Sequence, residues 1–338
     1  MSKIRAAVVG ASGYTGITLV NLLSRHPGVE LSQLVTRSLA TQLYSSLFPL
    51  LDLEGSFTVA ADPKSVDVIF SCLPHNQGAQ LVAGWRSAGA RVVDLSADFR
   101  LRDATLYPRW YQQSHPTPAL LSEAVLGLPE LYAPALPGAE LIAVPGCYAT
   151  ASILALAPAV QAGLVGDDVV IDGKSGVSGA GRSPSLGTHF AEINESVHSY
   201  AICGHRHLAE IEQELERLAA DRTNPRLTFI PHLIPMVRGL QVTCYFDSTS
   251  GEESMQSTYR SFYQAQPFTS IADQPMPTKA VTYTNHCLIT VGRQGEKVVV
   301  SAVIDNLLKG AAGQAVEAFN IAFGLERTTG LEGAAQWP

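Results

Sequence analysis

The stretch Gly10-Ala11-Ser12-Gly13-Tyr14-Thr15-Gly16 decides the fold of this 338-residue chain, because of what lies on either side of it. A short apolar run, residues 4–9, precedes it, and a helical pattern with Ile17, Val20 and Leu23 on one face follows it. Glycines in such a strand-to-helix turn let the backbone approach a diphosphate, whose negative charge then faces the helix N-terminus. The spacing is G-x-x-G-x-x-G, not the usual G-x-G-x-x-G. An ordinary glycine-rich turn is the alternative, but the position between strand and helix favours a dinucleotide site.

Outward from this stretch, short strand-like runs alternate with helical ones. We expect strands at 29–35, 66–72, 91–95 and 141–144, and a helix at 78–88. This alternation is typical of βαβ units joined by right-handed crossovers. It predicts an α/β domain with a Rossmann-type parallel sheet.

The pattern changes after about Cys147. The runs 286–291 and 297–304 flank a turn and indicate a β-hairpin, and 241–246 alternates like another strand. We therefore expect an α+β domain with a mostly antiparallel sheet. The helical pattern at 311–323 is expected to pack back on the first domain. The predicted domains are a dinucleotide-binding domain, 1–146 plus 309–338, and a catalytic and oligomerisation domain, 147–308.

The end of the second strand bears on the choice of cofactor. NAD sites usually place an acidic residue there to hold the ribose 2′-hydroxyl. Here the chain reads Thr36-Arg37-Ser38, and Glu30 stands at the start of the strand, where it should point elsewhere. An arginine with two hydroxyls suits a 2′-phosphate. The sequence thus favours NADP over NAD, and a solvated loop arginine is the alternative for Arg37.

Cys147 follows Pro145-Gly146 and opens a long apolar helix. The positive end of a helix dipole lowers the pKa of a thiol and raises its thiolate content, and nearby backbone N–H groups could hold an oxyanion. A small buried core cysteine is the alternative. We interpret Cys147 as a nucleophile. The other four cysteines are interpreted as structural: Cys72, Cys203, Cys244 and Cys287.

Two histidines, His205 and His207, precede a clear amphipathic helix. A histidine at a helix N-terminus is biased toward the neutral imidazole, which suits a general base or a hydrogen-bond donor. Glu210, one turn after His207, could orient that ring, so we favour His207 over His205 as the base. Together with Cys203, the two histidines also suggest a metal site as an alternative. The spacing matches no usual zinc pattern, however, and we predict no metal. Surface and capping histidines are the remaining alternative.

Composition excludes several classes of function. With 23 basic and 30 acidic residues the net charge is −7, which gives no support to nucleic-acid binding. No signal peptide is evident, and no uncharged apolar run reaches the roughly 18 residues that a membrane span needs. Five scattered cysteines without a C-x-x-C pair fit a reducing compartment, so we expect a cytoplasmic protein.

Six stretches together resemble the N-acetyl-gamma-glutamyl-phosphate reductase family and, more distantly, aspartate-semialdehyde dehydrogenase. They span nearly the whole chain in the family's order. The stretches are G-A-S-G-Y-T-G from Gly10, D-L-S-A-D-F-R from Asp94, V-P-G-C-Y-A-T from Val144, S-G-V-S-G-A-G-R from Ser175, G-H-R-H-L-A-E-I from Gly204 and D-N-L-L-K-G-A-A-G-Q-A from Asp305. The resemblance implies a second domain like that of glyceraldehyde-3-phosphate dehydrogenase. It also implies NADPH-dependent reduction of an acyl phosphate to an aldehyde through a cysteine thioester.

The resemblance also implies roles for single residues. Cys147 would be the nucleophile, the two histidines would supply acid–base chemistry, and the Gly10–Gly16 loop would hold the cofactor diphosphate. Asn306 would meet the nicotinamide. The remaining implied residues are Ser178, Gly179 and Gly181 at the junction of cofactor and substrate, Arg100 at the substrate phosphate, and Ser175 and Arg238 at other parts of the substrate.

Three rival functions stay open from the sequence. A relative in lysine or ornithine synthesis would act on a carrier-protein-linked substrate, and a basic rim would favour it. Aspartate-semialdehyde dehydrogenase would need a carboxylate in its pocket for the substrate amine. A non-catalytic dinucleotide-binding regulator would have an unreactive thiol. The expected partners are a small-molecule acyl phosphate and other copies of the chain, as a homodimer or homotetramer.

Overall fold

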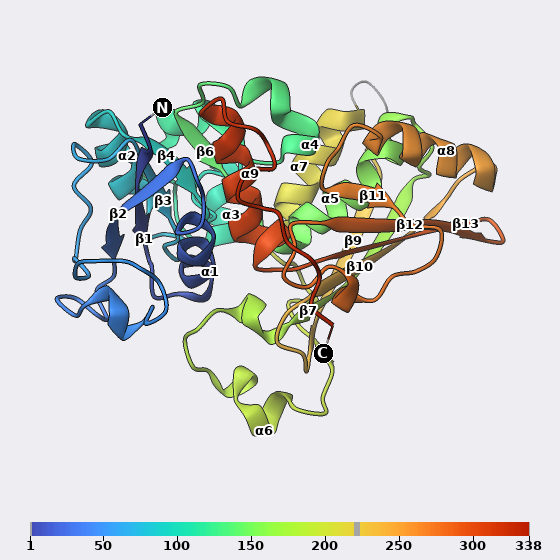
Figure 1. The fold of residues 1–338 in the computed structure, drawn as a ribbon. Coiled ribbons are helices and arrows are strands. Elements are labelled where there is room, and N and C mark those ends of the chain that lie inside the picture. Colours follow the sequence, from blue (N-terminus) through green and yellow to red (C-terminus); the bar gives the residue numbers. More distant parts are fainter. Residues whose placement is uncertain (1, 220–223, 338) are drawn as a thin grey trace. The chain divides into compact units, whose positions relative to one another are not determined.

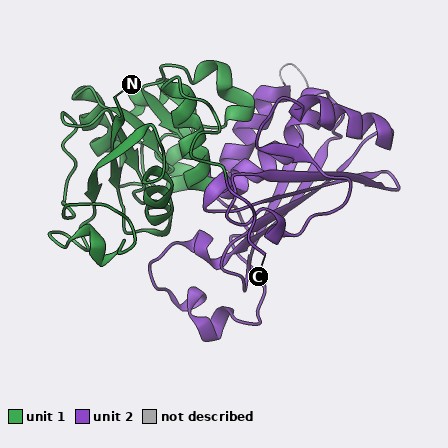
Figure 2. Cartoon of the chain, viewed as in Figure 1, with its two compact units in different colours: residues 1–145, 311–332 green, residues 146–310, 333–338 purple. Residues whose placement is uncertain are grey.

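The computed structural model describes residues 2–219 and 224–337. The chain divides into two compact units (Figure 2): unit 1 comprises Met1–Pro145 and Ala311–Glu332, and unit 2 comprises Gly146–Gly310 and Gly333–Pro338. The sequence analysis placed the whole C-terminal segment in the first domain. Its last residues instead group with unit 2, where the backbone N–H of Gln336 reaches the carbonyl of Thr282 at 3.4 Å.

Unit 1 is built on a parallel six-stranded sheet in the order β2-β1-β3-β4-β6-β5 (Figure 1). The two strands next to the glycine-rich turn have the predicted bounds, 4–9 and 29–35. β1 is buried over its last four residues, as expected for a strand covered on both faces. The strands are β1 (Ile4–Val9), β2 (Val29–Val35), β3 (Val68–Ser71), β4 (Arg91–Asp94), β5 (Ala124–Leu126) and β6 (Leu141–Ala143).

The helices of unit 1 begin after strand ends, as βαβ units require. Its helices are α1 (Tyr14–Leu23), α2 (Ala79–Ser87), α3 (Tyr107–Tyr111), α4 (Pro129–Tyr132) and α9 (Gly313–Ala322). α9 comes from the far end of the chain and packs against α1 (Figure 1). A buried hydrogen bond of 3.0 Å joins His26 Nε2, just after α1, to Asn320 Oδ1 on α9.

Unit 2 contains a mixed seven-stranded sheet in the order β11-β12-β13-β10-β7-β9-β8. Four of its six pairings are antiparallel, including the predicted hairpin, so the expectation of a mostly antiparallel sheet is confirmed. The strands are β7 (Asp168–Gly176), β8 (His198–Ser199), β9 (Arg226–Ile234), β10 (Leu240–Asp247), β11 (Thr269–Ile271), β12 (Cys287–Gln294) and β13 (Lys297–Ile304).

One face of this sheet is covered by α5 (Cys147–Gln161), α7 (His207–Ala219) and α8 (Glu252–Tyr263), as Figure 1 shows; the short α6 (Phe190–Ile193) lies in the connection between β7 and β8. α5 is buried on nearly all sides, because the sheet, α7 and α8 all pack on it. Its first residue, Cys147, therefore has a fixed backbone. Within residues 2–219 and 224–337, no helix combines the length and apolar character needed to cross a membrane.

Candidate active site

The glycine-rich turn of unit 1 allows very close approaches of the backbone. Gly10 has a φ of +83°, and a Cβ there would lie 2.6 Å from the carbonyl oxygen of Cys72. A Cβ on Gly16 would lie 2.2 Å from the carbonyl oxygen of Gly10, so only glycine allows the start of α1 to approach the loop. α1 begins at Tyr14, and the first-turn N–H groups of a helix have no partner within the helix. The N-terminus of α1 thus offers donors for an anion, and the binding of a diphosphate by this turn stays a prediction.

The predicted 2′-phosphate region lies at the end of β2. Thr36, Arg37 and Ser38 line a cavity of about 670 Å³ in unit 1. The hydroxyls of Thr36, Ser38 and Ser12 bond to one another at 2.7, 3.1 and 3.2 Å, so the loop and the strand end share one polar cluster. Gln77, Leu73 and several apolar side chains complete this lining, and the sequence analysis did not name them.

Glu30 is excluded from this cavity by strand register. It pairs with Arg5 near the start of β1, whereas Val35, at the other end of β2, pairs with Val9 beside the loop. Among the residues that the structure describes, the lining of the cavity includes no carboxylate. The arrangement leaves Arg37 as the charged group at the end of β2, which is the pattern that the sequence predicted for NADP.

Arg100 also belongs to unit 1, on the segment after β4, and its Nη2 donates to the carbonyl of Leu95 at 2.8 Å. Asp98, two residues earlier, accepts the backbone N–H groups of Asn76, Gly78 and Ala79 at 2.7 to 3.0 Å and so fixes the start of α2. Cys147 lies in unit 2, and a shared action of Arg100 and Cys147 on one substrate remains a prediction.

Cys147 stands at the N-terminus of α5, as predicted. Two glycines make its surroundings possible. A Cβ on Gly146 would lie 2.2 Å from Nε2 of His207, and a Cβ on Gly310 would lie 2.7 Å from Cβ of Cys147. Any other residue at either position would displace the histidine or the cysteine.

Glu210 connects α5, the helix that begins at Cys147, to His207. One carboxylate oxygen accepts the backbone N–H of Gly146 at 2.9 Å, and the other lies 3.9 Å from Nε2 of His207. Glu210 and His207 are both buried. The predicted pairing of these two side chains thus has a geometric basis, and the bond to Gly146, 64 residues away in sequence, was not foreseen.

His205 is held as a neutral ring. Burial, and then the positive charge of Arg206, lower its pKa to about 4. Its Nδ1 accepts the backbone N–H of His207 at 3.2 Å, which in a neutral imidazole places the hydrogen on Nε2. The rings of His205 and His207 meet edge to face with centroids 4.6 Å apart. His205 is therefore suited to donate a hydrogen bond.

These groups share one cavity of about 290 Å³ in unit 2. It brings together the predicted Cys147, Ser175, Gly179, His205 and His207. The sequence analysis gave no role to other lining residues, among them Tyr148, Ser185, Thr188, His198, Tyr200 and Arg206. Burial is the main cause that raises the pKa of Tyr200 to about 12, so its hydroxyl stays protonated beside the thiol.

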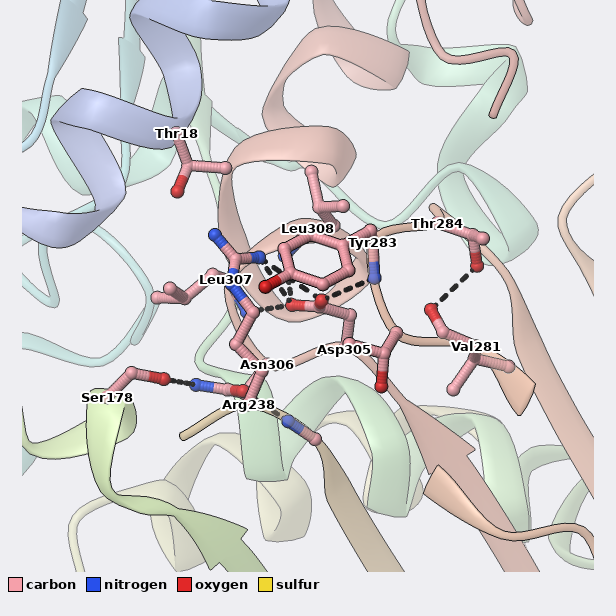
Figure 3. A network of polar contacts seen from close by, with 12 residues as sticks. Thr18, Ser178, Arg238, Val281, Tyr283, Thr284, Asp305, Asn306, Leu307 and Leu308 are labelled. Carbon is pink, nitrogen blue, oxygen red and sulfur yellow. Dashed lines mark hydrogen bonds and ion pairs between the residues drawn. The ribbon is translucent and has the colours of Figure 1, made fainter. Parts of the chain in front are cut away.

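Three of the remaining predicted residues, Ser178, Arg238 and Asn306, take part in the polar contacts of unit 2 that Figure 3 shows. Asn306 donates to the hydroxyl of Ser178 at 2.9 Å and accepts the backbone N–H of Gly239 at 2.8 Å. Arg238 forms an ion pair with Asp305 at 3.1 Å. Gly181, with a φ of +88°, ends the short turn Val177–Ala180. Asn306 and Arg238 thus have protein partners where the resemblance implied ligands.

Of the other three cysteines of unit 2, two have the buried positions expected of structural residues and one does not. Cys244 and Cys287 are buried in strands, whereas Cys203 is exposed. In unit 1, burial raises the pKa of Cys72 strongly. Across the described residues, no group of three or more histidine, cysteine or acidic side chains is arranged to hold a metal ion.

Comparison with known proteins decides the family. Residues 5–139 match the sequence model described as semialdehyde dehydrogenase, NAD binding domain, and residues 147–306 match semialdehyde dehydrogenase, dimerisation domain. Full-length relatives named N-acetyl-gamma-glutamyl-phosphate reductase occur in Dehalococcoides mccartyi, at 45% identity over 100% of both chains, and in Heliobacterium modesticaldum, at 45% identity over 99% of this chain and 100% of the relative. This chain belongs to the N-acetyl-gamma-glutamyl-phosphate reductase family.

Solved structures agree on the fold of this reductase family member. Aspartate semialdehyde dehydrogenase II of Vibrio cholerae superposes with a TM-score of 0.72 at 16% identity, covering 95% of this chain and 98% of the other. The aspartate semialdehyde dehydrogenase of Candida albicans, solved with NADP, gives 0.70 at 15% identity over 95% and 98%. The predicted α/β plus α+β architecture and the resemblance to the family are confirmed. The family also confirms an oxidoreductase with a nicotinamide dinucleotide cofactor, predicted to be NADP.

Proposed function

We propose that the chain reduces N-acetyl-gamma-glutamyl phosphate to N-acetylglutamate 5-semialdehyde with NADPH, in arginine biosynthesis. The observation that carries the proposal is the unit 2 cavity, in which Cys147 at a helix N-terminus meets His205 and His207. The 45% identity to full-length reductases supports the substrate. The glycine-rich loop and the cavity at Arg37 fit a dinucleotide phosphate, and bound NADPH supplies a hydride.

The chain's own residues prepare the covalent step. The thiolate of Cys147 attacks the acyl carbon, the bond from carbon to the phosphate oxygen breaks, and a thioester forms. The N-terminus of α5 favours the thiolate. Arg100, as the resemblance implies, binds the phosphate that departs. Arg206, which lines the same cavity as Cys147, supplies positive charge for an anionic substrate.

The two histidines divide the proton chemistry in this proposal. His205, neutral and carrying its hydrogen on Nε2, donates to the oxygen on which negative charge develops. His207, paired with Glu210, takes and returns protons during thioester formation and reduction. Once hydride has added to the thioester, breaking of the carbon–sulfur bond releases the aldehyde and restores the thiolate.

One observation separates this function from aspartate-semialdehyde dehydrogenase. A free amine in the substrate calls for a carboxylate in the pocket, and the described lining of the Cys147 cavity contains none. An N-acetyl group needs no such partner. The solved structures named aspartate-semialdehyde dehydrogenase share the fold at only 15–19% identity, whereas the reductases share 44–46%.

The proposal extends to assembly and location. We place the chain in the cytoplasm, because five scattered cysteines with no C-x-x-C pair fit a reducing compartment. We expect a homodimer or homotetramer assembled through unit 2, because the family model that matches residues 147–306 is described as a dimerisation domain.

The test is NADPH consumption with three acyl phosphates: those of N-acetylglutamate, of aspartate and of a carrier-protein-linked substrate. We expect kcat/KM to be highest for the N-acetylglutamate derivative. A preference for the carrier-linked compound would assign the chain to lysine or ornithine synthesis. Consumption with none of them, together with a Cys147 thiol no more reactive than free cysteine, would indicate a dinucleotide-binding regulator.

A further inference from the structure

Asp305 is a fully buried carboxylate at the end of β13, and its oxygens meet four groups of unit 2 (Figure 3). Arg238 Nη1 lies 3.2 and 3.1 Å from the two oxygens. The backbone N–H groups of Tyr283, Leu307 and Leu308 donate at 2.8, 2.8 and 3.1 Å. A carboxylate accepts this many bonds, whereas an amide in its place would put donors against donors.

The hydrogen bonds that Asp305 accepts shape the turn that follows it. Its side chain holds the N–H groups of Leu307 and Leu308, and its carbonyl oxygen accepts the N–H of Gly310 at 3.0 Å. The chain then continues as a π-helical turn, Leu308–Ala312, a rare form that often marks functional sites.

This turn places Gly310 directly against the nucleophile. A Cβ on Gly310 would lie 2.7 Å from Cβ and 3.2 Å from Cα of Cys147, so the two backbones are in close contact. A shift of the turn by a few tenths of an ångström would either press on Cys147 or leave a gap beside it.

Arg238 and Tyr283 stabilise the carboxylate from the other side. The Arg238 guanidinium lies 4.7 Å from the centre of the Tyr283 ring, and its charge compensates that of Asp305. Tyr283 has a φ of +66°, a strained conformation for a tyrosine, and its N–H bond to Asp305 holds it. The contacts of Arg238 with Asp305 and Tyr283 therefore explain the position of its side chain without a contact to the substrate.

We propose that Asp305 is a positioning residue for Cys147, acting through Gly310, and that Arg238 serves Asp305 rather than the substrate. The proposal rests on Cys147 being the nucleophile of the proposed function. Its test, however, can be read from the thiol alone, without substrate or cofactor.

The variants are Asp305→Asn, Gly310→Ala, Arg238→Met and the double variant Asp305→Asn/Gly310→Ala. Asp168→Asn is the matched control, because this exposed carboxylate pairs with Arg226 on the surface of the same unit. Two rates are measured: alkylation of Cys147 by iodoacetamide across pH, and kcat/KM. Thermal unfolding shows which variants fold.

Asp305→Asn and Gly310→Ala are each expected to change both rates by about ten- to a hundredfold, the usual effect of a small misplacement of a reacting group. The double variant should change them far less than the product of the single effects, since both act through one contact. Arg238→Met should alter the pH profile of alkylation in the same direction as Asp305→Asn.

Independent, multiplicative effects of the two substitutions would overturn the proposal. A rise in the substrate KM of Arg238→Met with unchanged alkylation would return Arg238 to a substrate-binding role. If Asp305→Asn does not fold, Gly310→Ala and Arg238→Met still decide between these outcomes. Loss of kcat/KM with wild-type alkylation in every variant would contradict positioning, whatever the substrate proves to be.

Discussion

At the scale of single residues, Cys147 is the proposed nucleophile, and its removal is the simplest test. Cys147→Ser is expected to lower the rate by at least about a thousandfold, because a hydroxyl is a far weaker nucleophile than a thiolate. NADPH affinity should stay unchanged, since the dinucleotide cavity is lined by residues of unit 1. Stopped-flow turnover and a fluorescence titration measure the two quantities.

The other cysteines provide the control for Cys147. Cys203→Ser removes an exposed thiol and should leave activity unchanged. An alkylating reagent should label Cys147 before Cys72, whose thiol pKa is raised by burial, and before Cys287, which is buried in a strand. Preferential labelling of Cys72 or Cys287, with activity lost in step, would contradict the assignment.

Arg37 tests the choice of NADP. Arg37→Ala should weaken NADPH binding by about 1–3 kcal/mol, the usual size of a charge-assisted contact, and leave NADH binding nearly unchanged. Arg25→Ala, an exposed arginine of unit 1 outside the lining of this cavity, is the matched control. Equal losses for both cofactors, measured by titration, would show that Arg37 does not bind the 2′-phosphate.

Variants of the two histidines should differ in the pH dependence of the reaction rate. A general base loses activity as it becomes protonated, which gives the acidic limb of a pH–rate profile. Since His205 has a pKa of about 4, its protonation does not account for a limb nearer neutrality, and the proposed base is His207. His207→Asn should therefore remove it, and His205→Asn should lower the rate while keeping it. The reverse result would exchange their roles.

Stability gives an independent check on His205. Its pKa of about 4 in the folded state lies below the ordinary value of 6.5, so the unfolded chain binds more protons between these two pH values. The free energy of unfolding should fall as pH drops through that window. Urea titrations should show a smaller fall for His205→Asn, and equal falls would mean that the ring is not kept neutral.

The sequence indicated which residues lie together better than it indicated what holds them in place. Cys147, His205 and His207 were expected to act together, and they line one cavity. Tyr200 was missed because no periodicity marks its segment; its place depends on a backbone bond to Pro231, in another strand. Two partners of Asp305, Arg238 and Tyr283, likewise come from distant parts of the chain, and no local sequence pattern indicates them.

At the scale of elements, α5 contains a proline at Pro158. Proline has no backbone N–H, so the carbonyl of Leu154, one turn earlier, loses its helical partner. The hydroxyl of Tyr263 on α8 donates to that carbonyl at 2.6 Å. A side chain 109 positions away in sequence thus completes the hydrogen bonding of the helix that begins at Cys147.

Tyr263→Phe is expected to lower the free energy of unfolding by about 1–3 kcal/mol, since it leaves a buried carbonyl unsatisfied. Pro158→Ala restores the helical N–H, and in that background the same change should cost much less. Urea unfolding of the four proteins gives the coupling. Equal costs in both backgrounds would show that the tyrosine does not compensate for the proline.

Strand prediction succeeded where the hydrophobic pattern is strong. β1 and β2 have the expected bounds, and β3 is shorter than the predicted 66–72 by two residues at its start and one at its end. β5 has only three residues, too few for a period. β9 was not predicted, and its parallel pairing with β7 joins segments nearly sixty positions apart, which no local signal could specify.

At the scale of the whole molecule, the proposed reaction needs groups from both units: the dinucleotide loop and Arg100 from unit 1, and Cys147 from unit 2. Arg100→Ala should raise the KM for phosphate in the reverse reaction by about ten- to a hundredfold, because one charge-assisted contact is lost. The aldehyde requirement should change far less. Arg102→Ala, an exposed neighbour, is the control; similar effects of both variants would remove Arg100 from the phosphate site.

The most direct measurement of acyl-phosphate chemistry is oxidation of N-acetylglutamate 5-semialdehyde with NADP, followed as inorganic phosphate is varied from zero. A thioester on Cys147 can be resolved by phosphate or by water. An active site that binds an acyl phosphate has an anion site and excludes water, so phosphate should be required, and arsenate should replace it. Steady oxidation in phosphate-free buffer, at the rate seen with phosphate, would show that water resolves the thioester and that the chain is a hydrolytic aldehyde dehydrogenase.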